Sequence, residues 1–265
     1  MSVNFPMSVN SAFLALCIGL CASPSFAVVL NNPYPAADAD KKIFYSSFSE
    51  QPKTLDPARS YSSNEYLFIG QIYEPLLQYD YFIRPYQLTS LTTTTMPTVE
   101  PLNKNGEPLK SPADAVGYTR YKIEIKKGIY YQPHPAFAQD AQGKPLYMGI
   151  TEDYLKREGI YQLADFAFTA TRELKADDYL YQIKRLATPR IQSPIYGLMS
   201  EHILGFANFK TQLPKNIVAQ GFLDLRKYPM AGLKKIDDYR FEVTLNGQYP
   251  QFMFWLAMPF FSPIP

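Results

Sequence analysis

Residues 53–77 read KTLDPARSYSSNEYLFIGQIYEPLL, and this stretch holds the main architectural signals of the 265-residue chain. Pro57 suits a turn or the first turn of a helix, and the serines that follow can cap one. Leucines, phenylalanine and isoleucines in residues 65–77 recur near helical spacing. Pro75 removes a backbone donor, so the helix is expected to end or kink by Glu74.

Several later stretches predict strands. Residues 121–126 (YKIEIK) and 241–245 (FEVTL) alternate apolar with polar residues, as half-buried strands do. A turn is expected at Lys127-Gly128. Residues 42–49 (KIFYSSFS) alternate more loosely and predict a first strand. Residues 96–117 are rich in Pro, Asn and Gly and predict a surface loop or a small hairpin.

Two helices are predicted in the second half of the chain. Glu152–Glu158 is a candidate short helix. A longer helix is expected to begin near Asp177-Asp178, where acidic residues suit the positive end of the helix dipole. Pro189 should stop it. The expected buried face of this second helix consists of Leu180, Ile183 and Leu186.

The first 27 residues predict a cleaved secretory leader. Ala12–Ala22 is apolar but too short to span a bilayer, Pro24 breaks any helix, and a small-x-small site ends at Ala27. This leader has no Lys or Arg near its start, so an ordinary buried apolar segment is the alternative.

Both cysteines, Cys17 and Cys21, lie inside the leader. The mature chain would therefore have none, and a real hydrophobic core rather than disulfides must hold it together. Lipid attachment at Cys21 is a rival interpretation. It is disfavoured because Leu20, just before the cysteine, is large.

Composition and motifs favour a binding protein. Charges nearly balance, with 26 Lys+Arg against 24 Asp+Glu, so nothing points to nucleic acid. The 21 tyrosines and 18 phenylalanines either fill a core or line a pocket for peptide-like ligands. His134 and His202 lack metal-ligand spacing, and there is no G-x-S-x-G elbow and no phosphate-binding loop. The sequence therefore predicts no catalytic residues, no metal site and no cofactor.

Taken in order, four stretches resemble the family 5 solute-binding proteins, the oligopeptide- and dipeptide-binding receptors of bacterial ABC importers. The family opens with a strand, an x-x-T-L-D-P turn, a helix and IYEPLL, and three further motifs follow. The similarity covers about residues 42–265, with an enlarged loop near 132–165. The stretches that carry it are KTLDPARSYSSNEYLFIGQIYEPLL (53–77), YKIEIKKGIYY (121–131), TRELKADDYLYQIKRLATPRIQSPIYGLM (171–199) and YRFEVTLNGQYPQFMFWLAMPFFSPIP (239–265).

The resemblance implies a mixed α/β fold: the first lobe of a two-lobed periplasmic-binding-protein type II fold, with a mixed β-sheet flanked by helices. Residues 28–265 would form the N-terminal part of the family domain, after a signal peptide of residues 1–27. Because family members are much longer, the chain is expected to be truncated before the second lobe. The apolar tail, residues 252–265, is accordingly expected to be core surface left without a partner.

The resemblance also implies a function. The chain would be a non-enzymatic, monomeric periplasmic receptor that holds a peptide between two lobes and delivers it to the permease subunits in the inner membrane. One lobe alone should bind peptide poorly. The alternative is an exported structural or envelope-associated module without a small-molecule cleft.

The expected ligand-binding residues also come from the resemblance. Ser49, Glu50, Gln51 and Pro52 should lie at the cleft because they follow the first strand, and Tyr196 should face the ligand because the family places an aromatic residue near there. At the start of the helix near Asp177-Asp178, Lys175 stands where the family usually has a capping threonine. Asp177 is the expected substitute cap.

Overall fold

The computed structural model describes most of the chain after residue 35. The predicted leader, its cleavage point after Ala27 and both cysteines lie outside the described residues, so those predictions stay open. Two compact units are distinguished, Met1–Ser47 and Phe48–Pro265, and each is considered by itself. In the first unit the structure describes one 3-10 turn, η1 (Ala36–Asp38). The described residues are 36–38, 40–43, 46–111, 114–214 and 223–265.

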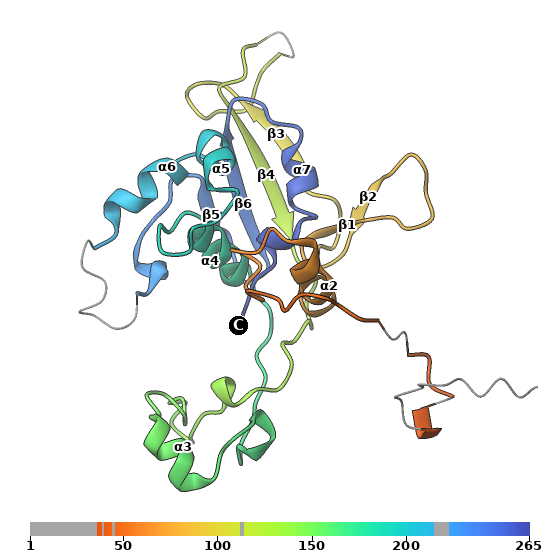
Figure 1. Cartoon of the computed structure of the whole chain (residues 1–265). Coiled ribbons are helices and arrows are strands. Elements are labelled where there is room, and N and C mark those ends of the chain that lie inside the picture. Colours follow the sequence, from red (N-terminus) through yellow and green to blue (C-terminus); the bar gives the residue numbers. More distant parts are fainter. Residues whose placement is uncertain (1–35, 39, 44–45, 112–113, 215–222) are drawn as a thin grey trace, which may run out of the picture. The chain divides into compact units, whose positions relative to one another are not determined.

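The second unit is a mixed α/β arrangement, as predicted (Figure 1). Its helices are α2 (Ser63–Ile72), α3 (Glu152–Glu158), α4 (Ala176–Leu186), α5 (Tyr196–His202), α6 (Phe206–Phe209) and α7 (Phe252–Trp255). Its strands are β1 (Leu77–Tyr79), β2 (Leu88–Ser90), β3 (Thr98–Leu102), β4 (Tyr118–Glu124), β5 (Leu233–Lys235) and β6 (Arg240–Asn246). Its 3-10 turns are η2 (Pro135–Phe137), η3 (Leu163–Asp165), η4 (Lys210–Gln212), η6 (Leu225–Lys227) and η7 (Pro259–Phe261).

The larger sheet has four strands in the order β3-β4-β6-β5, and the smaller sheet is the β1–β2 hairpin. Every strand pair in both described sheets is antiparallel. The prediction of a mixed sheet is therefore wrong for the described residues. The two strands that the sequence predicted best are direct neighbours, with Tyr121 of β4 opposite Val243 of β6.

One face of the larger sheet carries the core. Tyr121 and Ile123 of β4 and Phe241 and Val243 of β6 are all buried, and the register places them on the same face. The Tyr179 ring of α4 stacks on Phe241 at 5.8 Å, so α4 packs against this face. The alternation in the sequence predicted the buried face of both strands correctly.

The opposite face of the sheet is charged. Arg120 of β4 donates to Glu100 of β3 at 3.0 Å and lies 3.6 Å from Glu242 of β6. Lys122 also pairs with Glu100, at 3.2 Å. An antiparallel sheet that buries one face and places charges on the other matches the half-buried pattern of these strands.

Helix α2 begins at a serine cap and ends before Pro75, as predicted. Ser62 is the N-cap of α2, and its hydroxyl accepts from the backbone N–H of Asn64. The helix ends at Ile72, before Pro75, as the missing donor requires. Strands β1 and β2 follow and pair as a hairpin around the loop of residues 80–87.

Helix α4 begins and ends close to the prediction, but its cap differs. The backbone N–H of Lys175, the N-cap residue, donates to the Asp178 carboxylate at 2.8 Å. The expected substitute, Asp177, instead pairs with Lys235. Asp178 is the correct residue because the third helical position is the one whose side chain reaches back to the N-cap.

The prediction that the apolar tail, residues 252–265, lacks a packing partner is wrong. Phe252, Leu256 and Phe261 are buried, and the Phe252 ring lies edge-on to Tyr121 of β4 at 5.0 Å. The tail therefore packs on the core face of this chain's own sheet and is not left without a partner. Phe254 is the exception, because its side chain remains half exposed.

Two weaker stretches of the sequence have different outcomes. The first strand, predicted at 42–49, is absent from the described part of that stretch, because residues 42–43 and 46–49 form no strand. The stretch 96–117, predicted as a surface loop or a small hairpin, does form a hairpin: Leu102 bridges Pro108 within it, and its strand β3 pairs along its whole length with β4. The loose alternation of the first stretch was a weak signal, whereas β3 gains its order from pairing with a neighbour.

Candidate functional site

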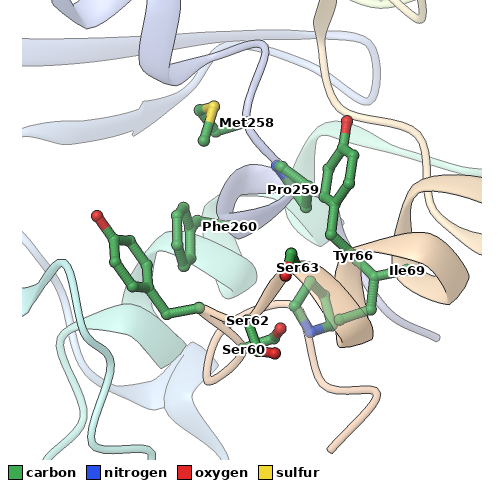
Figure 2. A pocket seen from close by; sticks show the side chains of 10 residues that line it. Ser60, Ser62, Ser63, Tyr66, Ile69, Met258, Pro259 and Phe260 are labelled. Carbon is green, nitrogen blue, oxygen red and sulfur yellow. The ribbon is translucent and has the colours of Figure 1, made fainter. Parts of the chain in front are cut away.

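A pocket of about 390 Å3 lies at the N-terminal end of α2. One wall is α2 with the loop before it, and the other is the tail that contains η7. Figure 2 shows Met258 and Phe260 on the side opposite Tyr66 and Ile69. The lining residues are Pro57, Ser60, Tyr61, Ser62, Ser63, Tyr66, Ile69, Met258, Pro259 and Phe260.

The surface of the pocket is mainly aromatic and aliphatic, with three serines. Tyr61 stacks on Phe260 with ring centroids 6.0 Å apart and bridges the two walls. Tyr61 and Tyr66 are both exposed, so their rings are free to meet a ligand. An apolar pocket with a few convergent hydroxyls is the usual form of a small-molecule or peptide site.

The loop before α2 is fixed by Glu65, a carboxylate in the first turn of the helix. Its oxygens accept from the Ser60 hydroxyl at 2.6 Å and from the backbone N–H of Lys53 at 3.2 Å. The hydrogen bond from Ser60, aided by backbone donors, lowers the pKa of the Glu65 carboxyl. Residues 53–60 are thereby folded back on α2, and the carboxylate stays ionised at neutral pH.

The two walls are joined by a polar chain through α4. Asp56 accepts from Arg185 at 2.6 Å, and Arg185 donates in turn to the Gln182 side-chain oxygen at 2.8 Å. Gln182 donates to the backbone carbonyl of Phe260, also at 2.8 Å. The Asp56 carboxylate also accepts from the backbone N–H of Ala58 and so orders the turn. This Asp56–Arg185–Gln182–Phe260 chain holds the loop and the tail at a fixed separation.

The predicted residues 49–52 lie beside this pocket but do not line it. Ser49, Glu50 and Gln51 are exposed, and Pro52 is half buried. The Glu50 carboxylate accepts from the Asn64 side chain at 3.1 Å. Asn64 is next in sequence to Ser63, a lining residue, so the segment adjoins the first turn of α2.

Tyr196 lies elsewhere and is not brought together with residues 49–52. It is the first residue of α5, and its half-buried ring packs against Phe206 at 5.6 Å. The Lys210 ammonium lies 5.8 Å from the centre of the same ring. Tyr196 does not line the pocket, and a ligand contact by this residue stays a prediction.

Sequence reasoning missed the lining residues. The run of serines and tyrosines in residues 60–66 is a signal that could have indicated them, because hydroxyls and aromatics alternate at a helix start. No local signal in residues 258–260 indicates that they meet this helix. Only the packing of the tail brings them there.

The arrangement is suited to binding. Within the described residues no group of three or more His, Cys, Asp and Glu side chains could hold a metal ion. In the same part of the chain, no helix has the length and apolar character needed to cross a bilayer. His134 caps η2 by accepting from the backbone N–H of Ala136, and His202 stacks on Tyr249 at 3.6 Å, so both histidines have structural contacts.

Comparison with known proteins gives structural neighbours only. No family model and no curated protein matches the chain. Among solved structures, the chain is similar to the ABC transporter-associated periplasmic binding protein DppA from Helicobacter pylori in complex with the peptide STSA. The identity is 19% and the TM-score 0.43, and the similarity covers 80% of this chain and 28% of that one.

Two other solved structures give similar values. The pheromone receptor PrgZ, described with its mode of peptide binding, is 16% identical with a TM-score of 0.45, over 80% of this chain and 28% of that one. The Escherichia coli murein tripeptide binding protein MppA is 15% identical with a TM-score of 0.41, over 82% and 30%. The chain thus spans less than a third of the length of each of these proteins.

Proposed function

We propose that this chain is the first lobe of an exported, two-lobed receptor that captures peptides for an ABC importer. The observation that carries the proposal is the pocket at the start of α2. Its tyrosines, Met258 and Phe260 suit the apolar side chains of a peptide. The Ser63 hydroxyl suits a main-chain amide group, since the hydroxyls of Ser60 and Ser62 already bond Glu65 and the backbone of Asn64. The motif resemblance of residues 53–77 supports the same conclusion.

The polar chain from Asp56 to Phe260 gives the proposal its physical basis. A pocket whose walls are fixed before the ligand arrives loses less conformational freedom on binding. Arg185 and Asp56 are both largely shielded from solvent, with 13% and 22% of their side chains exposed. Their pairing therefore persists at physiological salt concentrations, where a fully exposed pair would be screened.

In this proposal the remaining predicted parts have defined roles. Residues 1–27 direct export to the periplasm, and the monomeric lobe contributes one side of a peptide-binding cleft. Residues 49–52, which adjoin the pocket through Glu50 and Asn64, contact the ligand main chain, and Tyr196 contacts a more distant part of it. A second lobe closes over the peptide, and the permease in the inner membrane receives it. No cofactor or metal takes part.

The test is a nuclear magnetic resonance titration of the full chain with the peptides Ala-Ala-Ala and Ala-Phe-Ala. One lobe buries only part of the ligand, so we expect dissociation constants in the range of about 1 mM, with Ala-Phe-Ala binding more tightly. The shifted signals should cluster in residues 60–66 and 258–260. Tyr66→Ala should weaken binding of Ala-Phe-Ala. Tyr161→Ala, which removes a ring outside the pocket that is 83% exposed against 57% for Tyr66, should not.

Two results would overturn parts of this proposal. Micromolar affinity of the isolated chain would refute the requirement for a second lobe. Shifts that avoid both walls, or an equal loss of affinity in Tyr66→Ala and Tyr161→Ala, would refute the pocket as the binding site.

A further inference from the structure

The loop that joins β1 to β2 displays a concentrated group of exposed aromatic side chains. This tip loop, residues 80–87 (DYFIRPYQ), closes the hairpin labelled β1 and β2 in Figure 1. Phe82 is 89% exposed, Tyr81 80% and Tyr86 67%. Side chains this large and this apolar are costly to leave in water unless another surface covers them.

The tip loop satisfies many of its own polar groups. The Asp80 carboxylate accepts from the backbone N–H groups of Phe82 and Ile83 at 2.8 and 3.2 Å. The Arg84 guanidinium donates to the carbonyls of Tyr81 and Ile83 at 3.0 and 2.8 Å. The formal charges of Asp80 and Arg84 cancel. The loop therefore presents apolar rings while these backbone groups are already paired.

Contacts between aromatic rings stabilise the β1–β2 hairpin. Tyr79 of β1 stacks on Phe254 of α7 at 6.4 Å and meets Tyr86 edge-on at 6.3 Å. The Arg84 guanidinium lies 4.4 Å from the centre of the Tyr86 ring. The half-exposed Phe254 extends the same aromatic surface onto the tail. The tip is thus held in one shape by contacts that leave Tyr81 and Phe82 free.

We propose that the tip loop inserts shallowly into the interfacial layer of a phospholipid bilayer. Backbone groups that enter a bilayer need hydrogen-bond partners, and four of this loop are paired within it: the N–H groups of Phe82 and Ile83 and the carbonyls of Tyr81 and Ile83. Tyrosine and arginine combine an apolar body with a polar end, which suits the boundary between headgroups and acyl chains. A narrow hairpin tip of eight residues is small for a stable protein interface, which uses about 20–30 residues a side.

The charge balance of the tip loop determines which class of lipid it should bind. Because Arg84 is engaged with carbonyls and a ring, and Asp80 offsets its charge, the insertion does not depend on anionic lipid. Binding to neutral phosphatidylcholine vesicles should therefore change little with salt, since apolar burial drives it.

The test places an indole at the tip of the full chain. Phe82→Trp and a matched control, Tyr161→Trp at a site that is 83% exposed outside this loop, are mixed with phosphatidylcholine vesicles that contain brominated lipid. The unsubstituted chain, with Trp255 alone, provides the background spectrum. We expect a blue shift and quenching of the indole at position 82 and neither effect at position 161.

A second pair of variants measures the contribution of the rings. Tyr81→Ser with Phe82→Ser should lower the vesicle partition coefficient at least about tenfold, since two largely exposed aromatic surfaces are lost. Tyr161→Ser with Leu163→Ser should leave it unchanged. The predicted apolar leader is present in every variant, so the contribution of the rings is read as the difference between these two pairs of variants.

Three outcomes would overturn the proposal. The first is no vesicle binding, which would favour a protein as the partner of the tip. The second is binding without quenching at position 82, which would place the membrane contact elsewhere. The third is equal quenching at positions 82 and 161, which would indicate unspecific adhesion.

Discussion

The Asp56–Arg185 pair provides the sharpest test of how the pocket is built. In Arg185→Met the aliphatic stem is kept and the charge is removed, so Asp56 is left partly buried without its partner. Breaking a fully buried pair costs about 3–5 kcal/mol, and an exposed pair contributes about 0.2–1 kcal/mol. With 13% and 22% of the two side chains exposed, the expected loss of unfolding free energy is about 2 kcal/mol, between these limits.

Urea denaturation of Arg185→Met, Asp56→Asn and the double variant measures this interaction as a cycle. Circular dichroism follows the whole unit, and the fluorescence of Trp255 reports on the tail. We expect a coupling energy of about 1–2 kcal/mol between the two residues, because they share one hydrogen-bonded ion pair. The Trp255 spectrum of Arg185→Met should also change before unfolding, since Gln182 loses its link to Arg185.

The control is Arg240→Met, which removes an ion pair with Asp237 whose side chains are 58% and 41% exposed. We expect this variant to lose less than about 1 kcal/mol of unfolding free energy. Equal losses in Arg185→Met and Arg240→Met, or a coupling energy near zero, would refute the idea that the Asp56–Arg185 pair joins the two walls.

Two further predictions concern the loop before α2 and a glycine beside the sheet. Glu65→Gln should lower the unfolding free energy by about 1–3 kcal/mol at pH 7, because two donors lose their carboxylate acceptor. Folding lowers the pKa of Glu65. The stability that the ionised carboxylate provides is therefore present above pH 4.5, the ordinary pKa, and is lost as pH falls through the pKa of the folded state. A difference in unfolding free energy between wild type and Glu65→Gln that stayed constant from pH 7 to pH 3 would contradict this. Gly232→Ala should destabilise by about 1–3 kcal/mol or more, because its Cβ would lie 2.5 Å from the Leu204 carbonyl oxygen. Gly197→Ala in α5, where a Cβ meets nothing within 4 Å, should instead stabilise the protein by about 0.5–1 kcal/mol. A lower melting temperature for Gly197→Ala than for Gly232→Ala would show that the contact with the Leu204 carbonyl does not determine the stability of the Gly232 variant.

Several elements were predictable because their signals are local. The proline at position 75 ends α2 through a missing donor, and Glu152–Glu158 forms α3 within the predicted bounds. Strands β4 and β6 follow from alternation with a period of two, which selects the buried face without knowledge of the partner. Helix α4 has a face of apolar residues at helical spacing, and this face is buried.

The failures at β3 and at the tail share one physical cause. β3 has no strong pattern of its own and is ordered by pairing with β4. The tail was expected to lack a partner, yet Phe252 packs on Tyr121, more than a hundred positions earlier in the chain. Such contacts depend on which surfaces meet, and local propensity contains no information about that.

By itself, then, the sequence determined the end of α2, the positions of α3 and α4, and the buried faces of α4, β4 and β6, because hydrogen-bonding capacity and side-chain period act over a few residues. Tertiary structure alone decided that the tail closes the pocket at α2 and that Arg185 joins Asp56 to Gln182. These arrangements arise when separate segments bury their apolar faces together, and the polar groups carried along must then find partners across them.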